Sequence, residues 1–317
     1  SKCKMTSIGG QALIEGIMMR GPKKEALAVR TKDNSIDISY LDFTSIKDKF
    51  KILKLPILRG VVSFIESMVH GYKAMMTSAE KSGYLDEEEK ANNEKNEPKN
   101  KVLMSAVMTA ATVLGVVLSV VLFIYLPSLA FKGINYLVGG SLLAMQSFFE
   151  GIIKILIFLG YMVAISYMND IDRVFRYHGA EHKTIFCYEA GLDLTVENVR
   201  EMKRFHPRCG TSFMILMLIV SIFITFIIDS IFPILKTILW LRTIIKILLL
   251  PIICGIGYEL IKLCGKYNTV VTRIIAAPGL WIQRLTVKEP DDSMIEVAIA
   301  AMKEVIPEND NEEKTEC

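Results

Sequence analysis

Three of the four histidines of this 317-residue chain lie in two short clusters. The first cluster is His178-Gly179-Ala180-Glu181-His182, and the second is His206-Pro207-Arg208-Cys209. Two histidines four residues apart share one face of a helix, and neutral imidazoles are common zinc ligands. The spacing therefore predicts that His178 and His182 bind one ion, either Zn²⁺ or another divalent metal.

The pattern His-x-x-Glu-His is the reversed form of the zinc-protease signature, in which the glutamate acts as general base. Metal binding lowers the pKa of a water molecule to about 7, so Glu181 is the predicted catalytic residue. His206 is the predicted third ligand, which leaves one position open for catalysis. Cys209 as a fourth ligand would instead close a structural site. A third interpretation is that the histidines only hydrogen-bond at a membrane interface.

Other charged residues are weaker candidates for contacts with a substrate or with the metal ligands. Glu15 and Arg20 lie in a glycine-rich segment, and Glu259 lies near the end of an apolar segment. A carboxylate in that position needs a metal or an arginine as its partner. Asp291 and Asp292 precede Ser293, and we interpret them first as negative charge at a helix N-terminus.

The composition predicts a mainly α-helical integral membrane protein. Hydrophobic residues make up 51% of the chain, and its mean hydropathy is +0.37. A helix needs roughly 20 apolar residues to cross a bilayer. We expect four such spans, within 102–131, 141–169 and 209–228 and around 247–258. Pro251 should kink or end a helix, which makes an interfacial helix followed by a tilted span an alternative for the fourth. Lys154, Arg242 and Lys246 should snorkel or pair.

The distribution of basic residues predicts the orientation in the membrane. The loop from Asp170 to Gly210 holds seven Lys and Arg residues, whereas the loop from Lys132 to Gly140 holds one. Cytoplasmic loops carry the excess of positive charge, so the long loop and both termini should be cytoplasmic. Residues 1–50 contain no apolar signal core, so the first span is expected to act as the membrane signal. Six cysteines without paired spacing fit a reducing compartment.

The chain divides into segments of different character. We expect a β-rich cytoplasmic unit at 1–50, with strands at 25–30 and 36–40, and an amphipathic helix at 55–79. A flexible charged linker at 80–101 leads to a membrane domain at 102–265 that contains the His-rich loop 170–210. The second span should continue without a break through the histidine cluster and end at Gly191. A C-terminal segment at 266–306 should be interrupted at Ala276-Ala277-Pro278-Gly279 and end in a helix capped by Ser293 and Glu296. A disordered acidic tail follows at 307–317.

Several blocks together resemble the YqhQ-type bacterial membrane protein family over almost the whole chain. They are residues 9–22 (GGQALIEGIMMRGP), 177–183 (YHGAEHK), 206–213 (HPRCGTSF), 283–286 (QRLT) and 289–293 (EPDDS). The family is uncharacterised and has been classed as a predicted metal-dependent enzyme. The resemblance implies a bacterial cytoplasmic membrane protein and supplies no substrate. It adds Arg284 to the candidates and places Glu15, Arg20 and the run from Glu289 to Asp292 within the motifs.

The hypothesis from the sequence is a zinc-dependent hydrolase at the cytoplasmic membrane surface, acting on a membrane-associated peptide or a lipid-linked substrate. The alternative is a membrane scaffold or an insertion or assembly factor, in which a closed His/Cys site holds helices together and a membrane-protein partner docks. A transporter is less favoured, because the spans show no inverted repeat. No basic stripe, phosphate loop or zinc-finger spacing indicates nucleic acid. The sequence does not determine the oligomeric state.

Overall fold

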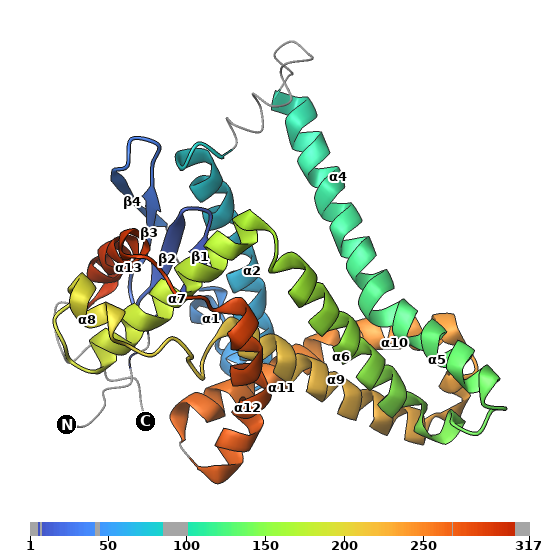
Figure 1. Ribbon diagram of the computed structural model, residues 1–317. Coiled ribbons are helices and arrows are strands. Elements are labelled where there is room, and N and C mark those ends of the chain that lie inside the picture. Colours follow the sequence, from blue (N-terminus) through green and yellow to red (C-terminus); the bar gives the residue numbers. More distant parts are fainter. Residues whose placement is uncertain (1–5, 7, 42–44, 85–100, 268, 308–317) are drawn as a thin grey trace.

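The computed structural model describes residues 6, 8–41, 45–84, 101–267 and 269–307. A small sheet with its covering helices forms one part of the molecule, and a long bundle of apolar helices extends from it (Figure 1). Most of the predicted linker and nearly all of the predicted acidic tail lie outside the described residues. The fold is therefore mainly helical with one β-rich unit, as the composition and the residue patterns predict.

The β-rich unit is an antiparallel meander in which the strands pair in the order β1-β2-β3-β4. The strands are β1 (Gly9–Leu13), β2 (Gly16–Arg20), β3 (Glu25–Arg30) and β4 (Ile36–Leu41). The expected pairing of β3 with β4 is confirmed, and Asn34 takes the positive φ of 67° that their turn requires. The glycine-rich segment before them forms two further strands that the residue pattern had not indicated. Glu15 has a φ of 50° in the turn between these two strands.

Both faces of the sheet are buried. Ala26 and Ala28 of β3 face a core shared with helices α7 (Asn169–Glu189) and α13 (Asp292–Val305). Leu27 and Val29 face the opposite way, toward Ala74 of helix α2 (Leu58–Lys81). Alternate side chains of a strand point to opposite faces, so β3 contributes to two cores at once. This arrangement fixes α7, which carries the first histidine cluster, against the sheet.

The apolar helices agree with the predicted spans in length and composition. Three continuous helical stretches are long and apolar enough to cross a membrane, and they are Thr112–Leu137, Leu143–Ile165 and Gly210–Ile231. The first comprises the end of α4 (Lys101–Val120), a π-turn (Val121–Tyr125) and α5 (Leu126–Leu137). A fourth crossing is possible if α10 (Leu239–Leu248) and α11 (Leu250–Lys266), which bend by 45°, count as one span. Pro251 begins the second half of that pair, as proline at the first turn of a helix does.

The second and third of these stretches contain α6 (Gln146–Ile165) and α9 (Gly210–Ile231). The other elements are α1 (Ile46–Lys49), η1 (Lys51–Lys54), η3 (Leu143–Met145), α8 (Val196–Arg200), η4 (Pro233–Lys236) and α12 (Val270–Thr286).

Three local expectations from the sequence are wrong. The second span does not continue into the histidine cluster, because α6 ends at Ile165 and α7 begins anew at Asn169 after an extended Met168. Asp170 and Asp172 in its first turn are typical of a helix N-terminus. Helix α12 runs through Pro278 without a break. Asp291, and not Ser293, caps α13 by accepting a hydrogen bond from the backbone of Met294 at 3.0 Å.

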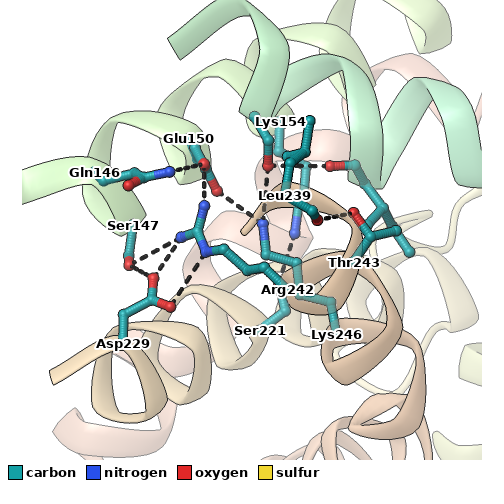
Figure 2. A network of polar contacts seen from close by, with 12 residues as sticks. Gln146, Ser147, Glu150, Lys154, Ser221, Asp229, Leu239, Arg242, Thr243 and Lys246 are labelled. Atoms are coloured by element: carbon teal, nitrogen blue, oxygen red, sulfur yellow. Dashed lines mark hydrogen bonds and ion pairs between the residues drawn. The ribbon is translucent and has the colours of Figure 1, made fainter. Parts of the chain in front are cut away.

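A buried ionic network holds α10 against α6 and α9 (Figure 2). Arg242 pairs with Glu150 and with Asp229, and Lys246 Nζ lies 2.7 Å from Glu150 Oε2. Lys154 donates to Ser221 at 3.3 Å. The expectation that Arg242 and Lys246 pair is therefore confirmed. A buried charge is costly unless it has a partner, so these contacts fix the position of the short α10 helix.

Candidate metal centre

Helix α7 presents His178 and His182 on one face, one turn apart, with ring centroids separated by 4.4 Å. Cys209 is the N-cap residue of α9 and reaches the same point, where its Sγ lies 3.1 Å from His178 Nε2. One ligand atom from each of the three side chains lies within 4.8 Å of the other two. All three side chains are buried or half-buried. The structure thus brings together two of the predicted histidines and the predicted cysteine.

Backbone carbonyls fix the orientation of both imidazole rings. The Nδ1 atom of His178 lies 2.9 Å from the carbonyl oxygen of Thr286, and that of His182 lies 2.6 Å from the carbonyl oxygen of Arg204. A carbonyl can only accept a hydrogen bond, so each Nδ1 carries the proton and donates it. In a neutral imidazole the lone pair then resides on Nε2. Both Nε2 atoms therefore keep a lone pair with which they could bind a metal, an arrangement that is usual for metal-binding histidines.

The three side chains fit a zinc ion after a small adjustment. Tetrahedral bonds of about 2.05 Å to nitrogen and about 2.3 Å to sulfur place the nitrogen and sulfur atoms about 3.6 Å apart. The observed separation of His178 Nε2 and Cys209 Sγ is 3.1 Å. His178 Nε2 and Cys209 Sγ would need to move apart by about 0.5 Å, which small side-chain rotations can supply. Two imidazole nitrogens and one thiolate form a donor set typical of zinc.

His178 and Cys209 each favour the charged form of the other across their 3.1 Å contact. Burial opposes ionisation of either group, but the attraction between them outweighs it. Their interaction raises the pKa of His178 to about 9 and holds the pKa of Cys209 well below its usual value. The neighbouring imidazoles thus favour the thiolate form of Cys209, which is the form that binds metals.

Glu181 lies beside the cluster on the flank of α7 that faces β1. Its side chain is buried, and it accepts a hydrogen bond from the backbone N–H of Gly10. A Cβ at Gly10 would lie 3.0 Å from the carboxyl carbon of Glu181, so the absent side chain permits this approach. Burial raises the pKa of Glu181, whereas the charges of His178 and His182 act in the opposite direction. A carboxyl group with a raised pKa is suited to transferring protons near neutral pH.

His206 borders the cluster without joining its ligand atoms. Its ring lies 5.6 Å from that of His182, and its backbone N–H donates to Gln283 at 2.8 Å. The Nδ1 atom of His206 accepts from the backbone of Arg208 at 3.2 Å, and Nε2 lies 3.8 Å from Glu189. Cys209, and not His206, therefore lies closest to His178 and His182 as the third potential ligand.

The space beside Gly179 is filled by the backbone of Lys288. A Cβ at this position would lie 1.9 Å from the carbonyl oxygen of Lys288. The backbone of Lys288 donates to the carbonyl of Phe175 at 2.9 Å, so residues 286–290 cross α7 as a strap. Gly179 therefore permits close contact between the strap and the helix, and this contact places the Thr286 carbonyl at His178.

The other acidic candidates have basic or backbone partners. Glu15 pairs with Arg173 and accepts from the hydroxyl of Tyr177 at 3.2 Å. Glu259 pairs with Arg59, as expected for a carboxylate that needs a metal or an arginine. Asp291 is the N-cap of α13, and Asp292 pairs with Arg200 at 2.5 Å. Glu289 binds Lys183 and Arg204 beside the cluster.

The two predicted arginines lie apart from the ligand atoms. Arg20 lies at the end of β2, opposite Glu25 in the sheet. Burial lowers the pKa of Arg20, and Glu25 and Glu66 oppose that change. Arg284 lies near the end of α12 and is exposed.

No residue pattern indicates the backbone groups that orient the histidines. The acceptors are the carbonyls of Arg204 and Thr286, which any residue type supplies. Gln283 was missed as well, although its amide binds both the N–H and the carbonyl of His206, at 2.8 and 2.7 Å. Its place in the block 283–286 was the one available indication.

Comparison with known proteins places the chain in a family. A protein-family model described as "Protein of unknown function (DUF1385)" matches residues 55–308. The chain belongs to the DUF1385 family. It is also 36% identical over 299 residues to the "Uncharacterized protein YqhQ" of Bacillus subtilis (strain 168), covering 94% of this chain and 92% of that protein. No solved structure matches it significantly. The expected resemblance to YqhQ-type proteins is confirmed, and the DUF1385 match includes all three clustered ligand residues.

Proposed function

We propose that this protein is a zinc-dependent hydrolase of the bacterial cytoplasmic membrane, with His178, His182 and Cys209 as metal ligands and Glu181 as the acid–base residue. The observation that carries the proposal is the convergence of two imidazole Nε2 atoms, each freed by an Nδ1–carbonyl hydrogen bond, with the sulfur of Cys209. Such a hydrogen bond fixes the tautomer and orientation of the ring, as is usual for histidines that bind a metal.

Three protein ligands leave one tetrahedral position for water or substrate, which is the coordination of catalytic zinc. A bound ion would supply the Lewis acid that activates water at neutral pH. The role of Glu181 is to hold and transfer the proton, since its carboxyl is buried beside the ligands and its pKa is raised by that burial. The hydrogen bond from Gly10 fixes the carboxyl in place.

The location of the site favours a membrane-associated substrate. Cys209 immediately precedes α9, one of the helices long enough to cross a bilayer. The basic residues of 170–210 favour a cytoplasmic position for this end of α9, with both termini on the same side. A membrane-associated peptide or a lipid-linked molecule would reach the site at the membrane surface.

Metal content tests the ligand set. Protein purified in detergent should contain about one equivalent of zinc by elemental analysis, because three protein ligands bind one ion. Replacement of His182 or Cys209 by alanine should abolish it. His206→Ala is the matched control, because its ring nitrogens bind Arg208 and Glu189, and it should retain the metal. Loss of zinc in His206→Ala with retention in Cys209→Ala would refute the assignment.

Glu181→Gln tests the hydrolase. The glutamine keeps the size of the side chain and an oxygen for the Gly10 hydrogen bond. We expect normal zinc content and melting temperature, with loss of product formation from a solubilised bacterial membrane extract followed by mass spectrometry. Equal products from wild type and variant, or none from either, would contradict the catalytic role.

A structural metal site is the second candidate, and the chain segments that meet at the cluster favour it. The ligands and their carbonyl partners come from α7, from residues 204–209 and from the end of α12. A metal there would join three segments that are far apart in sequence. In that case a chelator should lower the melting temperature strongly while Glu181→Gln changes neither stability nor any cellular role.

A further inference from the structure

A cavity of about 540 Å³ lies at the end of the apolar helices that is remote from the metal centre. The second half of α5, the turn after it, the start of α6 and the connection between η4 and α10 form its walls. Helix α6, with 20 residues and therefore about 30 Å long, separates the two sites. The cavity has the volume of a small-molecule site, for which 300–1,000 Å³ is usual.

Two lysines and an amide supply the donors of this cavity. Lys132 and Lys236 both line it, and no ion pair joins either of them to a carboxylate within the described part of the chain. Asn135 accepts from the backbone of Leu142 at 3.0 Å through its oxygen, which leaves its amide nitrogen as a donor. Two cations with a neighbouring donor favour an anion such as a phosphate.

Gln146 adds an acceptor with no partner. It lines the cavity but is only 1% exposed, and its amide nitrogen donates to Glu150 at 2.8 Å. Its oxygen has no hydrogen-bond partner among the described residues and points away from the network in Figure 2. Exchange of the two amide atoms would place oxygen against the carboxylate, so the orientation is fixed. A buried acceptor without a partner is costly, and a ligand with a hydroxyl would remove that cost.

The neighbouring ionic network also favours an anion. It contains the three basic side chains Lys154, Arg242 and Lys246 against the two carboxylates Glu150 and Asp229. Basic side chains therefore outnumber carboxylates by one in this network. Glu150 binds Gln146 directly, and Arg242 and Lys246 both pair with Glu150, so its negative charge is offset where the network adjoins the cavity. The attraction is weakly screened because the groups are buried.

We propose that this cavity binds a phosphoglycerol group, with the phosphate at Lys132 and Lys236 and a glycerol hydroxyl at the Gln146 oxygen. The proposal rests on the proposed membrane placement of the helices and is independent of the metal centre. Phe131 and Leu143 give the cavity apolar walls, and the neighbouring Tyr136 and Leu137 are 85% and 83% exposed. These surfaces would face lipid, so the headgroup of phosphatidylglycerol is the expected source.

Lipid binding tests the site in the full chain. The protein is placed in nanodiscs of phosphatidylcholine containing a small fraction of phosphatidylglycerol, and bound lipid is counted by native mass spectrometry. A hydrogen bond from a charged group is worth at least about tenfold in affinity, so Lys132→Gln with Lys236→Gln should weaken phosphatidylglycerol retention by about a hundredfold. Lys262→Gln with Lys266→Gln, at the other end of the helices, is the matched control and should change little.

Two further comparisons identify the recognised group and its source. Wild type should prefer phosphatidylglycerol to phosphatidic acid, which lacks the hydroxyls, and Gln146→Met should remove that preference. Binding of soluble glycerol 3-phosphate that depends on the same lysines supports the site with a free phosphate ester as its ligand. Equal retention of phosphatidylcholine and phosphatidylglycerol, or equal losses in the two lysine pairs, overturns the proposal. Cys209→Ala should bind phosphatidylglycerol normally, which separates this result from the fate of the hydrolase.

Discussion

Substitution of Gly179 by alanine tests the idea that the strap at 286–290 positions His178. The added Cβ would lie 1.9 Å from the Lys288 carbonyl, whereas an ordinary contact begins at 3.4 Å. Strap and helix must then separate by about 1.5 Å, which is the difference between these values. That movement would break the hydrogen bonds of Lys288 to Phe175 and of His178 to Thr286, both 2.9 Å long.

The expected cost follows from these contacts. Two lost hydrogen bonds cost about 2 kcal/mol, overpacking costs about 1–3 kcal/mol, and the better helix propensity of alanine offsets about 1 kcal/mol. The net loss of about 2–4 kcal/mol should lower the melting temperature in detergent by roughly 5–10 °C. Zinc affinity should fall as well, because His178 loses the acceptor that orients its ring.

Gly160→Ala is the matched control for this experiment. Gly160 lies within α6, and a Cβ there would meet nothing within 4 Å. Alanine should leave the melting temperature unchanged or raise it slightly, since it stabilises a helix by up to about 1 kcal/mol. If Gly179→Ala melts and binds zinc as Gly160→Ala does, the strap does not position His178.

Three other predictions concern charged groups. Arg242→Met should destabilise the protein by about 3–5 kcal/mol in a thermal melt, because it leaves buried carboxylates without their partner, whereas Arg204→Met at an exposed ion pair should cost less than about 1 kcal/mol. Zinc binding at pH 7.5 should release at least about one proton, because His178 has a pKa of about 9 and must lose its proton to bind the metal. Calorimetry in two buffers of different ionisation enthalpy measures this number. Without metal, the lowered pKa of Cys209 makes the free energy of unfolding rise with pH up to the usual pKa of a thiol. The raised pKa of His178 makes the free energy of unfolding fall between pH 6.5 and about 9. The two effects oppose each other, so melting temperatures should be level between pH 6.5 and 9 and should fall on acidification below 6.5. Cys209→Ser removes the partner of His178, and a melting profile unchanged by it would exclude the ion pair as the cause.

Much of the architecture follows from local patterns in the sequence. The uncharged stretches predict the apolar helices, because a helix needs roughly 20 apolar residues to span a bilayer and stretches of that length are visible in the sequence. The alternation in residues 25–40 predicts β3 and β4, and Gly191 ends α7 with a positive φ of 70° as expected. The glycine-rich segment before β3 shows no such alternation. Its two strands form because β2 pairs with β3 and α7 packs against the resulting sheet.

The candidate site divides in the same way. The spacing of His178 and His182 determines by itself that their side chains share a helix face, because the period of the helix fixes it. The choice between His206 and Cys209 depends on three-dimensional contacts. Gln283 accepts a hydrogen bond from the backbone N–H of His206, and Glu189 lies beside its ring. The start of α9 directs the sulfur of Cys209 to the histidines.

The sequence alone determined that two histidines would share one face of a helix, with a glutamate directly before the second. Only the tertiary structure decided which third side chain meets them, which nitrogen of each ring is left as a ligand, and where Glu181 points. These properties depend on the carbonyls of Arg204 and Thr286 and on the N–H of Gly10. Backbone groups are the same in every residue, so packing, and not residue type, brings them to the site.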